Sequence, residues 1–400
     1  MFNVQKIKRD FPALRAGGVY LDNAATTQMP EVVWESMQAY LVAGRGNPHR
    51  GLHAWAERAS GALQESRRQV AALLGAEPDE LLFTKSATEG LNLLATSLAA
   101  HLGPGDEVLL SIFEHHANLL PWRELAKRQG FSLRYMPMAQ DGSVDLDLVK
   151  GMVTAATKVI SITYASNVLG VILPVAEITR LGHAVGALVI VDAAQVVGHV
   201  PVDVKILGCD ALVFGAHKMY GPDGVGAVYV NGNLRKMLKP FLYGGGMVTE
   251  VLDDEIHYAD DLRLFEAGSP NVTGAIGLAA ACKYLMSLGL AEIQQHEAGL
   301  TQELMARLVE VPEVKVYVPN PKFGRLGVVS MSLEGVHSHD LAQVLADQGI
   351  AVRAGYHCAA PLTRCLNVSG TVRVSLGVYN DLADIEQLVT GIETGLKRLV

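Results

Sequence analysis

Two residues of this sequence, Lys218 and Asp192, follow apolar runs and are of types that support chemistry at a carbonyl group. Lys218 stands in ALVFGAHKMYGPDG, between an apolar run and a glycine-rich turn. A lysine in apolar surroundings has a lowered pKa and forms Schiff bases with carbonyl groups. Asp192 ends ALVIVD, and a buried carboxylate requires a cationic partner, which a protonated pyridine nitrogen supplies. The pair matches pyridoxal phosphate enzymes, although a loop lysine and a helix-capping aspartate explain each residue alone.

Two further motifs place polar residues directly after apolar runs. Thr88 and Glu89 open a helical segment after LLFT, where free N–H groups and the helix dipole bind an anion such as phosphate. His115 and His116 follow EVLLS, and a histidine there can stack on a flat cofactor and move protons. Simple capping and an interior histidine are the alternatives for each motif alone. The order Thr, His, Asp and Lys, each after its own run, is typical of a fold-type I pyridoxal phosphate enzyme.

Cys358, in RAGYHCAAPL, is a further residue whose type supports chemistry, and by itself it has three possible roles. A free cysteine is most often a small buried hydrophobe, but it also serves as a nucleophile or as a metal ligand. A zinc-binding module that does not catalyse a reaction would use His337, His339, His357 and Cys358. Their spacing is not that of a zinc finger, and such a module leaves Lys218 and Asp192 unexplained.

The elements that position these residues follow from alternating apolar and amphipathic segments. Amphipathic stretches such as 90–101, 118–130 and 174–186 separate the apolar runs, and this pattern predicts a mostly parallel sheet covered by helices on both faces. Ligands of such sheets bind at the carboxyl ends of the strands. The seven predicted strands are 81–84, 107–111, 132–136, 158–164, 187–192, 211–215 and 226–230.

The chain is predicted to form an α/β fold with a second, smaller α+β domain. We expect an N-terminal segment (1–20) packing with the small domain, a large cofactor-binding domain (21–275) and a small C-terminal domain (276–400) that carries the cysteine loop. Helices are expected over 275–310, 338–348 and 382–399, with strands near VKVYV, VVSMSL and IAVRAG.

Composition excludes several classes of partner. The net charge of −8 over 400 residues, with no basic tract, argues against nucleic acid. No run approaches the roughly 18 apolar residues of a membrane helix, and the N-terminus does not read as a secretory leader. The four cysteines form no evident framework, which indicates a reducing, cytoplasmic location.

The sequence resembles the class V aminotransferase superfamily and, within it, the group II cysteine desulfurases of the SufS/CsdA type. The resemblance covers nearly the whole chain, and the segment between Cys358 and Arg373 is as short as in group II. The motifs that carry it are YLDNAATTQ, HRGLH, ATEGLN, EHHANLLPW, ASNVLG, VDAAQ, HKMYGPDG, FEAGSPN, RAGYHCAAPL and RVSLGVYN.

The resemblance implies pyridoxal 5'-phosphate as cofactor and assigns residues to it. Lys218 would hold the cofactor covalently and then move protons, while Asp192 would pair with the ring nitrogen. Gln195 would contact the ring hydroxyl, and His115 would stack on the ring. The phosphate would be bound by Thr88, by His217 and by Ser269 of a second subunit, which implies a homodimer.

The resemblance also implies the substrate and the reaction. Arg373 and Asn167 would hold the carboxylate of L-cysteine, and His53 and Arg353 are also assigned to the substrate. Cys358 would attack the substrate sulfur, giving L-alanine and a persulfide that supplies sulfur for iron–sulfur cluster assembly, without a metal at the site.

The sulfur acceptor would be of the SufU or SufE type, and His339 is a candidate contact for a SufU-type acceptor. Selenocysteine lyase, kynureninase and epimerase activities are the alternatives within the superfamily, and the loop cysteine speaks against the last two. The chain departs from the family at Gly215, where relatives often carry serine, and at Tyr356, where many carry histidine.

Overall fold

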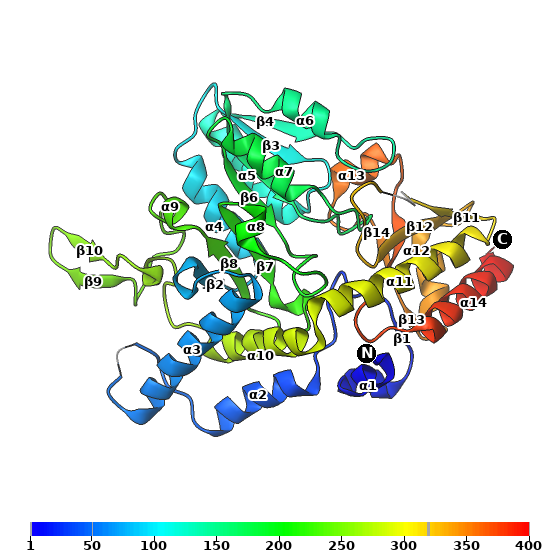
Figure 1. Ribbon diagram of the computed structural model, residues 1–400, viewed down its shortest axis with the longest axis horizontal. Coiled ribbons are helices and arrows are strands. Elements are labelled where there is room, and N and C mark those ends of the chain that lie inside the picture. Colours follow the sequence, from blue (N-terminus) through cyan, green and yellow to red (C-terminus); the bar gives the residue numbers. More distant parts are fainter. Residues whose placement is uncertain (1, 50, 318–320, 400) are drawn as a thin grey trace.

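A seven-stranded sheet forms the centre of the molecule (Figure 1), in a computed structural model that describes residues 2–49, 51–317 and 321–399. Strand β8 is antiparallel to both of its neighbours, and the other neighbouring pairs are parallel. The predicted mostly parallel sheet is therefore confirmed. In spatial order the strands are β2 (Leu81–Thr84), β8 (Gly226–Val230), β7 (Ala211–Gly215), β6 (Leu188–Asp192), β5 (Thr157–Thr163), β3 (Glu107–Ser111) and β4 (Ser132–Met136).

Helices cover both faces of this sheet because alternate strand residues point to opposite sides. In β3, Val108 and Leu110 pack in one buried cluster, whereas Leu109 packs in the other. The helices that contribute to the cluster around Val108 are α4 (Ala87–Ala99), α5 (His116–Gln129) and the short α9 (Gly232–Arg235). Those that contribute to the cluster around Leu109 include α3 (Ala54–Leu73), α6 (Leu146–Met152), α7 (Val175–His183), α8 (Val204–Leu207) and α10 (Val272–Leu288).

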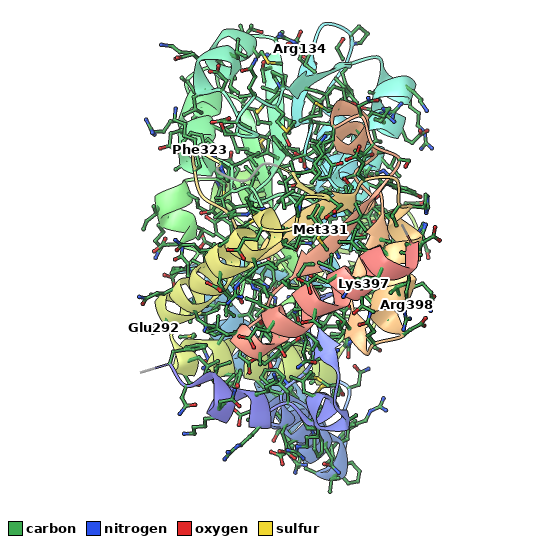
Figure 2. All side chains as sticks on the ribbon, turned by 90° about the vertical axis from the view of Figure 1, so that its right-hand side faces the viewer. Arg134, Glu292, Phe323, Met331, Lys397 and Arg398 are labelled. Atoms are coloured by element: carbon green, nitrogen blue, oxygen red, sulfur yellow. The ribbon has the colours of Figure 1, made fainter. Side chains whose placement is uncertain are left out.

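A second, four-stranded antiparallel sheet lies beside the first one (Figure 1). In spatial order it comprises β11 (Val314–Val316), β12 (Val328–Leu333), β15 (Thr371–Ser375) and β14 (Arg353–Gly355). Its apolar side packs with α11 (Leu290–Val309), α12 (Ser338–Ala346) and α14 (Leu382–Leu399). Figure 2 shows α11, which carries Glu292, beside α14, which ends near Lys397 and Arg398. The predicted strand at VKVYV extends to Val318, which is outside the described residues.

The N-terminal segment contacts the C-terminal part of the chain. Lys8 of α1 (Val4–Arg9) forms ion pairs with Asp381 and Asp384, at 3.3 and 3.1 Å. Strand β1 (Val19–Tyr20) pairs with β13 (Ile350–Ala351). Helix α10 packs against α3 and α2 (Glu31–Val42) rather than against the small sheet. The domain limits at 20 and 275 stay a prediction.

A hairpin of β9 (Val248–Val251) and β10 (Ile256–Tyr258) projects from the body of the molecule (Figure 1). It carries exposed apolar side chains, among them Val251 and Ile256. Within the described residues no single helix is long and apolar enough to cross a membrane; α10 and α11 together reach that length and composition, but with a bend of 76°.

Candidate active site

A cavity of about 390 Å³ lies at the carboxyl edge of the large sheet and contains most of the predicted site residues. Parallel strands end at this edge, so the residues that follow them meet although they are far apart in sequence. Residues from β15 and from the turn before α13 (Ala360–Cys365) close the other side. The predicted residues in its wall are Thr88, His115, Asn167, Asp192, Gln195, His217, Lys218, Arg353, Cys358 and Arg373.

Lys218 and Asp192 lie in the same cavity wall, as the sequence predicted for neighbouring strand ends. Burial lowers the pKa of Lys218 to about 8, against the attraction of Asp192, and Arg373 lowers it further. Burial raises the pKa of the Asp192 carboxyl, while a hydrogen bond from the Ala194 N–H (3.0 Å) and the charge of Lys218 oppose the rise. The site thus combines an amine that is partly neutral near physiological pH with a buried carboxylate that attracts a cation.

The backbone of Lys218 is held by a buried pair that the sequence did not reveal. His199 Nε2 lies 3.1 Å from the Lys218 carbonyl oxygen, and its Nδ1 lies 3.0 Å from both carboxylate oxygens of Glu297 in α11. Since a carbonyl oxygen only accepts, Nε2 carries a proton. Burial opposes the charged ring, but Glu297 raises the pKa of His199 above its ordinary value. The pair connects the lysine to α11.

The start of α4 offers an anion site at the cavity wall. Ser86 caps this helix, its hydroxyl accepting from the Glu89 N–H, and Ser86, Ala87 and Thr88 all line the cavity. First-turn N–H groups of a helix lack intrahelical acceptors and attract phosphate. A Cβ at Gly215 would lie 3.2 Å from the His217 ring, so a side chain at that position competes with His217 for space.

His115 and Gln195 line the cavity and are the residues there that suit contact with a flat cofactor ring. His115 caps α5, its Nδ1 accepting from the Ala117 N–H at 3.1 Å. Burial lowers the pKa of His115 to about 4, with Lys218 adding to the effect, so the imidazole is neutral at physiological pH. Gln195 donates to the Ala24 carbonyl at 3.0 Å. The neutral imidazole and the buried amide suit an aromatic cofactor without adding charge.

Glu114 is another buried residue whose role the sequence did not indicate, although it lies in the motif EHHANLLPW. Its carboxylate accepts from the Ser111 hydroxyl and N–H, from the Thr163 N–H and from the Asn118 amide. Burial raises its pKa to about 7. These hydrogen bonds connect the ends of β3 and β5 immediately before His115. They therefore fix the position from which the His115 imidazole extends into the cavity.

Arg373 and Arg353 both donate hydrogen bonds to Asp22. Asp22 lies in the motif YLDNAATTQ, but nothing in the sequence indicated that it would bind these arginines. Arg373 Nη2 donates to Asp22 Oδ1 at 3.0 Å, and Arg353 Nε donates to the same carboxylate at 3.2 and 3.0 Å. Arg373 Nη1 also donates to the Asn167 carbonyl at 3.0 Å, while its buried Nε has no hydrogen-bond acceptor among the described residues. Burial lowers the pKa of Arg373 and Asp22 opposes this, so a fixed, charged fork faces the cavity.

Cys358 is exposed at the cavity wall, on a turn with unusual backbone geometry. His357 (φ 52°) and Cys358 (φ 56°) are both left-handed, a conformation that costs a non-glycine residue roughly 1–2 kcal/mol. The His116 N–H donates to the Cys358 carbonyl at 2.8 Å, and the His116 ring lies 6.2 Å from that of Tyr356. An exposed sulfur on a fixed turn can reach a substrate in the cavity.

Two predicted residues lie outside this cavity. Ser269 is exposed and lines neighbouring cavities, one of them shared with Lys85 and Glu89. His53 is an exposed cap of α3, accepting from the Ala56 N–H at 3.3 Å; Arg50 of the same HRGLH motif is outside the described residues. A single chain therefore does not bring Ser269 or His53 into the cavity wall.

His337 and His339 lie together near the cysteine turn, with ring centroids 5.1 Å apart. A Cβ at Gly355 would lie 3.9 Å from His339 Nε2. Across residues 2–49, 51–317 and 321–399, no group of three or more His, Cys, Asp or Glu side chains is arranged to hold a metal ion. The geometry does not support the zinc module considered as an alternative.

Comparison with known proteins gives matches over the full length. The sequence matches the Aminotransferase class-V family over residues 19–388. A probable cysteine desulfurase of Pseudomonas aeruginosa is 41% identical, with 98% of both chains covered. Among solved structures, a cysteine desulfurase from Thermococcus onnurineus has a TM-score of 0.95 at 37% identity, covering 99% of this chain and 98% of that one. The cysteine desulfurase CsdA of Escherichia coli has a TM-score of 0.93 at 35% identity, covering both chains completely.

Proposed function

The chain belongs to the class-V aminotransferase family, and from this premise we propose that it is a pyridoxal phosphate-dependent L-cysteine desulfurase. The predicted fold-type I architecture is confirmed by the full-length similarity to cysteine desulfurases. The observation that carries the proposal is the presence of Cys358, Lys218 and Arg373 in the wall of one cavity. A nucleophile, a proton-transfer group and a carboxylate-binding fork are the groups that desulfuration of an amino acid requires.

The residues of the cavity fit pyridoxal phosphate. Bound there, the cofactor supplies an electron sink for negative charge at the α-carbon of the substrate. Lys218 would hold it through the side-chain amine, and Asp192 would keep its ring nitrogen protonated. Gln195 and His115 would contact the ring. The start of α4 at Thr88, together with His217 and a partner's Ser269, would bind the phosphate.

The chain's own groups then divide the work of the reaction. Arg373 orients the substrate carboxylate, with Asn167, Arg353 and His53 as further substrate contacts. The neutral Lys218 amine takes the α-proton, which its pKa of about 8 allows near physiological pH. The Cys358 thiolate attacks the substrate sulfur, so that the S–S bond forms as the C–S bond breaks. The electron pair of the broken bond stays with the carbon fragment, which is protonated to give L-alanine.

A homodimer would complete the site. Ser269 and His53 are exposed and lie outside the cavity of their own chain, so a second subunit is the source that would bring them to it. The β9–β10 hairpin, which projects from the molecule and carries exposed apolar side chains, offers a surface for such contact. Sedimentation analysis of the protein tests this proposal, and a monomer that retains full cofactor affinity would contradict it.

The persulfide would be passed to an acceptor of the SufU or SufE type for iron–sulfur cluster assembly. The position of His339 beside the cysteine turn supports a contact with a SufU-type acceptor. Transfer to such an acceptor that is unaffected by His339→Ala, together with strong stimulation by a SufE-type protein, would exclude that contact. The unpaired cysteines support a reducing, cytoplasmic location.

The activity is tested by measuring alanine and sulfide from L-cysteine in the presence of a reductant. Equimolar products that disappear in Cys358→Ala but persist in Cys365→Ala support the proposal, because Cys365 is a second exposed thiol outside the cavity. Alanine formation at the wild-type rate in Cys358→Ala would contradict it. A parallel assay with L-selenocysteine tests the selenocysteine lyase alternative, in which the loss of Cys358 matters less because selenium leaves more readily.

A further inference from the structure

The turn that carries Cys358 requires an external anchor. His357 and Cys358 are consecutive non-glycine residues in the left-handed region. Such a conformation persists only where the surrounding structure holds it. Two backbone carbonyls of the turn are held from the large-sheet side. The Asn167 amide donates to the His357 carbonyl at 2.7 Å, and the His116 N–H donates to that of Cys358 at 2.8 Å.

The His357 ring provides a third point of attachment, on the small sheet. The side chain is 8% exposed, and its Nε2 lies 2.9 Å from the Thr371 hydroxyl oxygen on β15. Thr371 is also the register partner of Gly355, the last residue of β14 before the turn. Arg373 stands two residues further along the same strand. An anchor at Thr371 therefore fixes Cys358 relative to the group that binds the substrate carboxylate.

A chain of hydrogen bonds fixes the tautomer of this ring. The Val168 carbonyl only accepts, so the Ser330 hydroxyl donates to it, at 2.6 Å. The Thr371 hydroxyl then donates to Ser330 Oγ at 3.3 Å, which leaves the Thr371 oxygen as an acceptor for His357. Nε2 must carry the proton, and Nδ1 is a buried lone pair without a hydrogen-bond donor in the part of the chain that the structure describes.

The surroundings keep the ring neutral. Burial lowers the pKa of His357 to about 3; the charges of Arg373 and Arg353 add to the effect, and the backbone of Thr371 opposes it. A neutral ring with a fixed Nε2–H does not change its hydrogen bonding between pH 5 and 9. The attachment is therefore permanent rather than a pH-dependent switch.

We propose that His357 is a positioning residue that anchors the Cys358 turn to β15 through its Nε2–H and the Thr371 hydroxyl. This inference rests on the proposed function in that Cys358 is the nucleophile, but the anchor itself exists without turnover. The relay runs from His357 through Thr371 and Ser330 of the small sheet to Val168, in the loop that follows β5 of the large sheet. Cys358 thus attacks from a fixed site rather than from a mobile loop.

Two pairs of variants separate the anchor from a general packing role. In His357→Gln the amide nitrogen replaces Nε2 and keeps a donor for Thr371, whereas in His357→Asn the shorter amide reaches only the position of Nδ1. Thr371→Ser keeps the hydroxyl, and Thr371→Val removes it at similar volume. His337→Gln, at an exposed histidine, serves as a matched control.

The measurement is hydrogen–deuterium exchange of the holoenzyme, read at the amides of His116, Ala359 and Ala360, whose hydrogen bonds report on the turn. We expect about tenfold faster exchange in His357→Asn and Thr371→Val, as for loss of one buried hydrogen bond. His357→Gln, Thr371→Ser and His337→Gln should match the wild type. Exchange elsewhere in α5 controls for global unfolding.

The kinetic readout is a separation of substrate binding from sulfur transfer. Variants without the anchor should bind L-cysteine with unchanged affinity, seen in the visible spectrum, but form the Cys358 persulfide about tenfold more slowly. Equal amide exchange rates in His357→Gln and His357→Asn, whether both are faster than wild type or both match it, would overturn the proposed anchor. If Thr371→Val does not fold, the comparison of His357→Gln with His357→Asn still tests the anchor. A wild-type protein inactive on L-cysteine would refute the proposed function while leaving the exchange result intact.

Discussion

The lowered pKa of Lys218 predicts how fast the apoprotein captures pyridoxal phosphate at different pH. Only the neutral amine attacks an aldehyde, and the pKa of Lys218 is about 8 instead of the ordinary 10.5. The neutral fraction is then about one tenth at pH 7, one half at pH 8 and nine tenths at pH 9. We expect the capture rate, followed by visible absorbance in a stopped-flow instrument, to rise about fivefold from pH 7 to pH 8 and to level off above pH 9.

The direction in which Asp192 shifts the pKa of Lys218 provides a second check on the pH dependence of the capture rate. The negative charge of Asp192 raises the pKa of Lys218, so Asp192→Asn should move the midpoint below pH 8. The pKa values of His115 and His217 are both lowered by burial, so neither imidazole titrates in this window. A rate that continues to rise about tenfold per pH unit up to pH 10 would show an unperturbed lysine. A midpoint that moves upward in Asp192→Asn would also refute the reasoning.

Three other substitutions have expected outcomes. Cys358→Ser should retain L-cysteine binding, measured by the visible spectrum, and lose sulfur transfer, while Cys365→Ser behaves as wild type; loss of both functions in Cys358→Ser would contradict the assigned role. Arg373→Lys replaces a two-donor fork by a point charge and should raise KM for L-cysteine about ten- to hundredfold in steady-state assays. An unchanged KM would show that Arg373 does not bind the substrate carboxylate. Glu297→Gln leaves the buried His199 imidazolium without its partner and should lower the free energy of unfolding by about 3–5 kcal/mol in urea titrations. The control Glu292→Gln, at an exposed residue, should have no measurable effect. Equal stability of Glu297→Gln and Glu292→Gln would exclude a charged pair of His199 and Glu297.

The sequence predicted the strands of the large sheet well because buried parallel strands are continuous apolar runs. The strand ends bring Thr88, His115, Asp192 and Lys218 to one cavity, as their positions after the runs suggested. The amphipathic stretch 90–101 marked only the interior of α4, which begins at Ala87 after its cap Ser86, one residue before the Thr88 and Glu89 that were expected to open it. A cap is a local hydrogen bond that apolar periodicity does not report.

The residues that hold the site in place were not predictable in the same way. Asp22 meets Arg373 across 351 positions, and His199 meets Glu297 across 98. Neither pair has a local spacing that marks it, since the partners come together only after the two sheets have packed. His357 was visible beside Cys358, but its bond to Thr371 depends on how β14 pairs with β15.

The most direct test of the account is mass spectrometry of the peptide that contains Cys358 after one turnover of L-cysteine without an acceptor or a reductant. We predict that Cys358 gains one sulfur atom in step with the release of one L-alanine, while Cys209, Cys282 and Cys365 remain unmodified thiols. L-Alanine release with no added sulfur on Cys358, or with the sulfur on another cysteine, would contradict the assignment of the nucleophile.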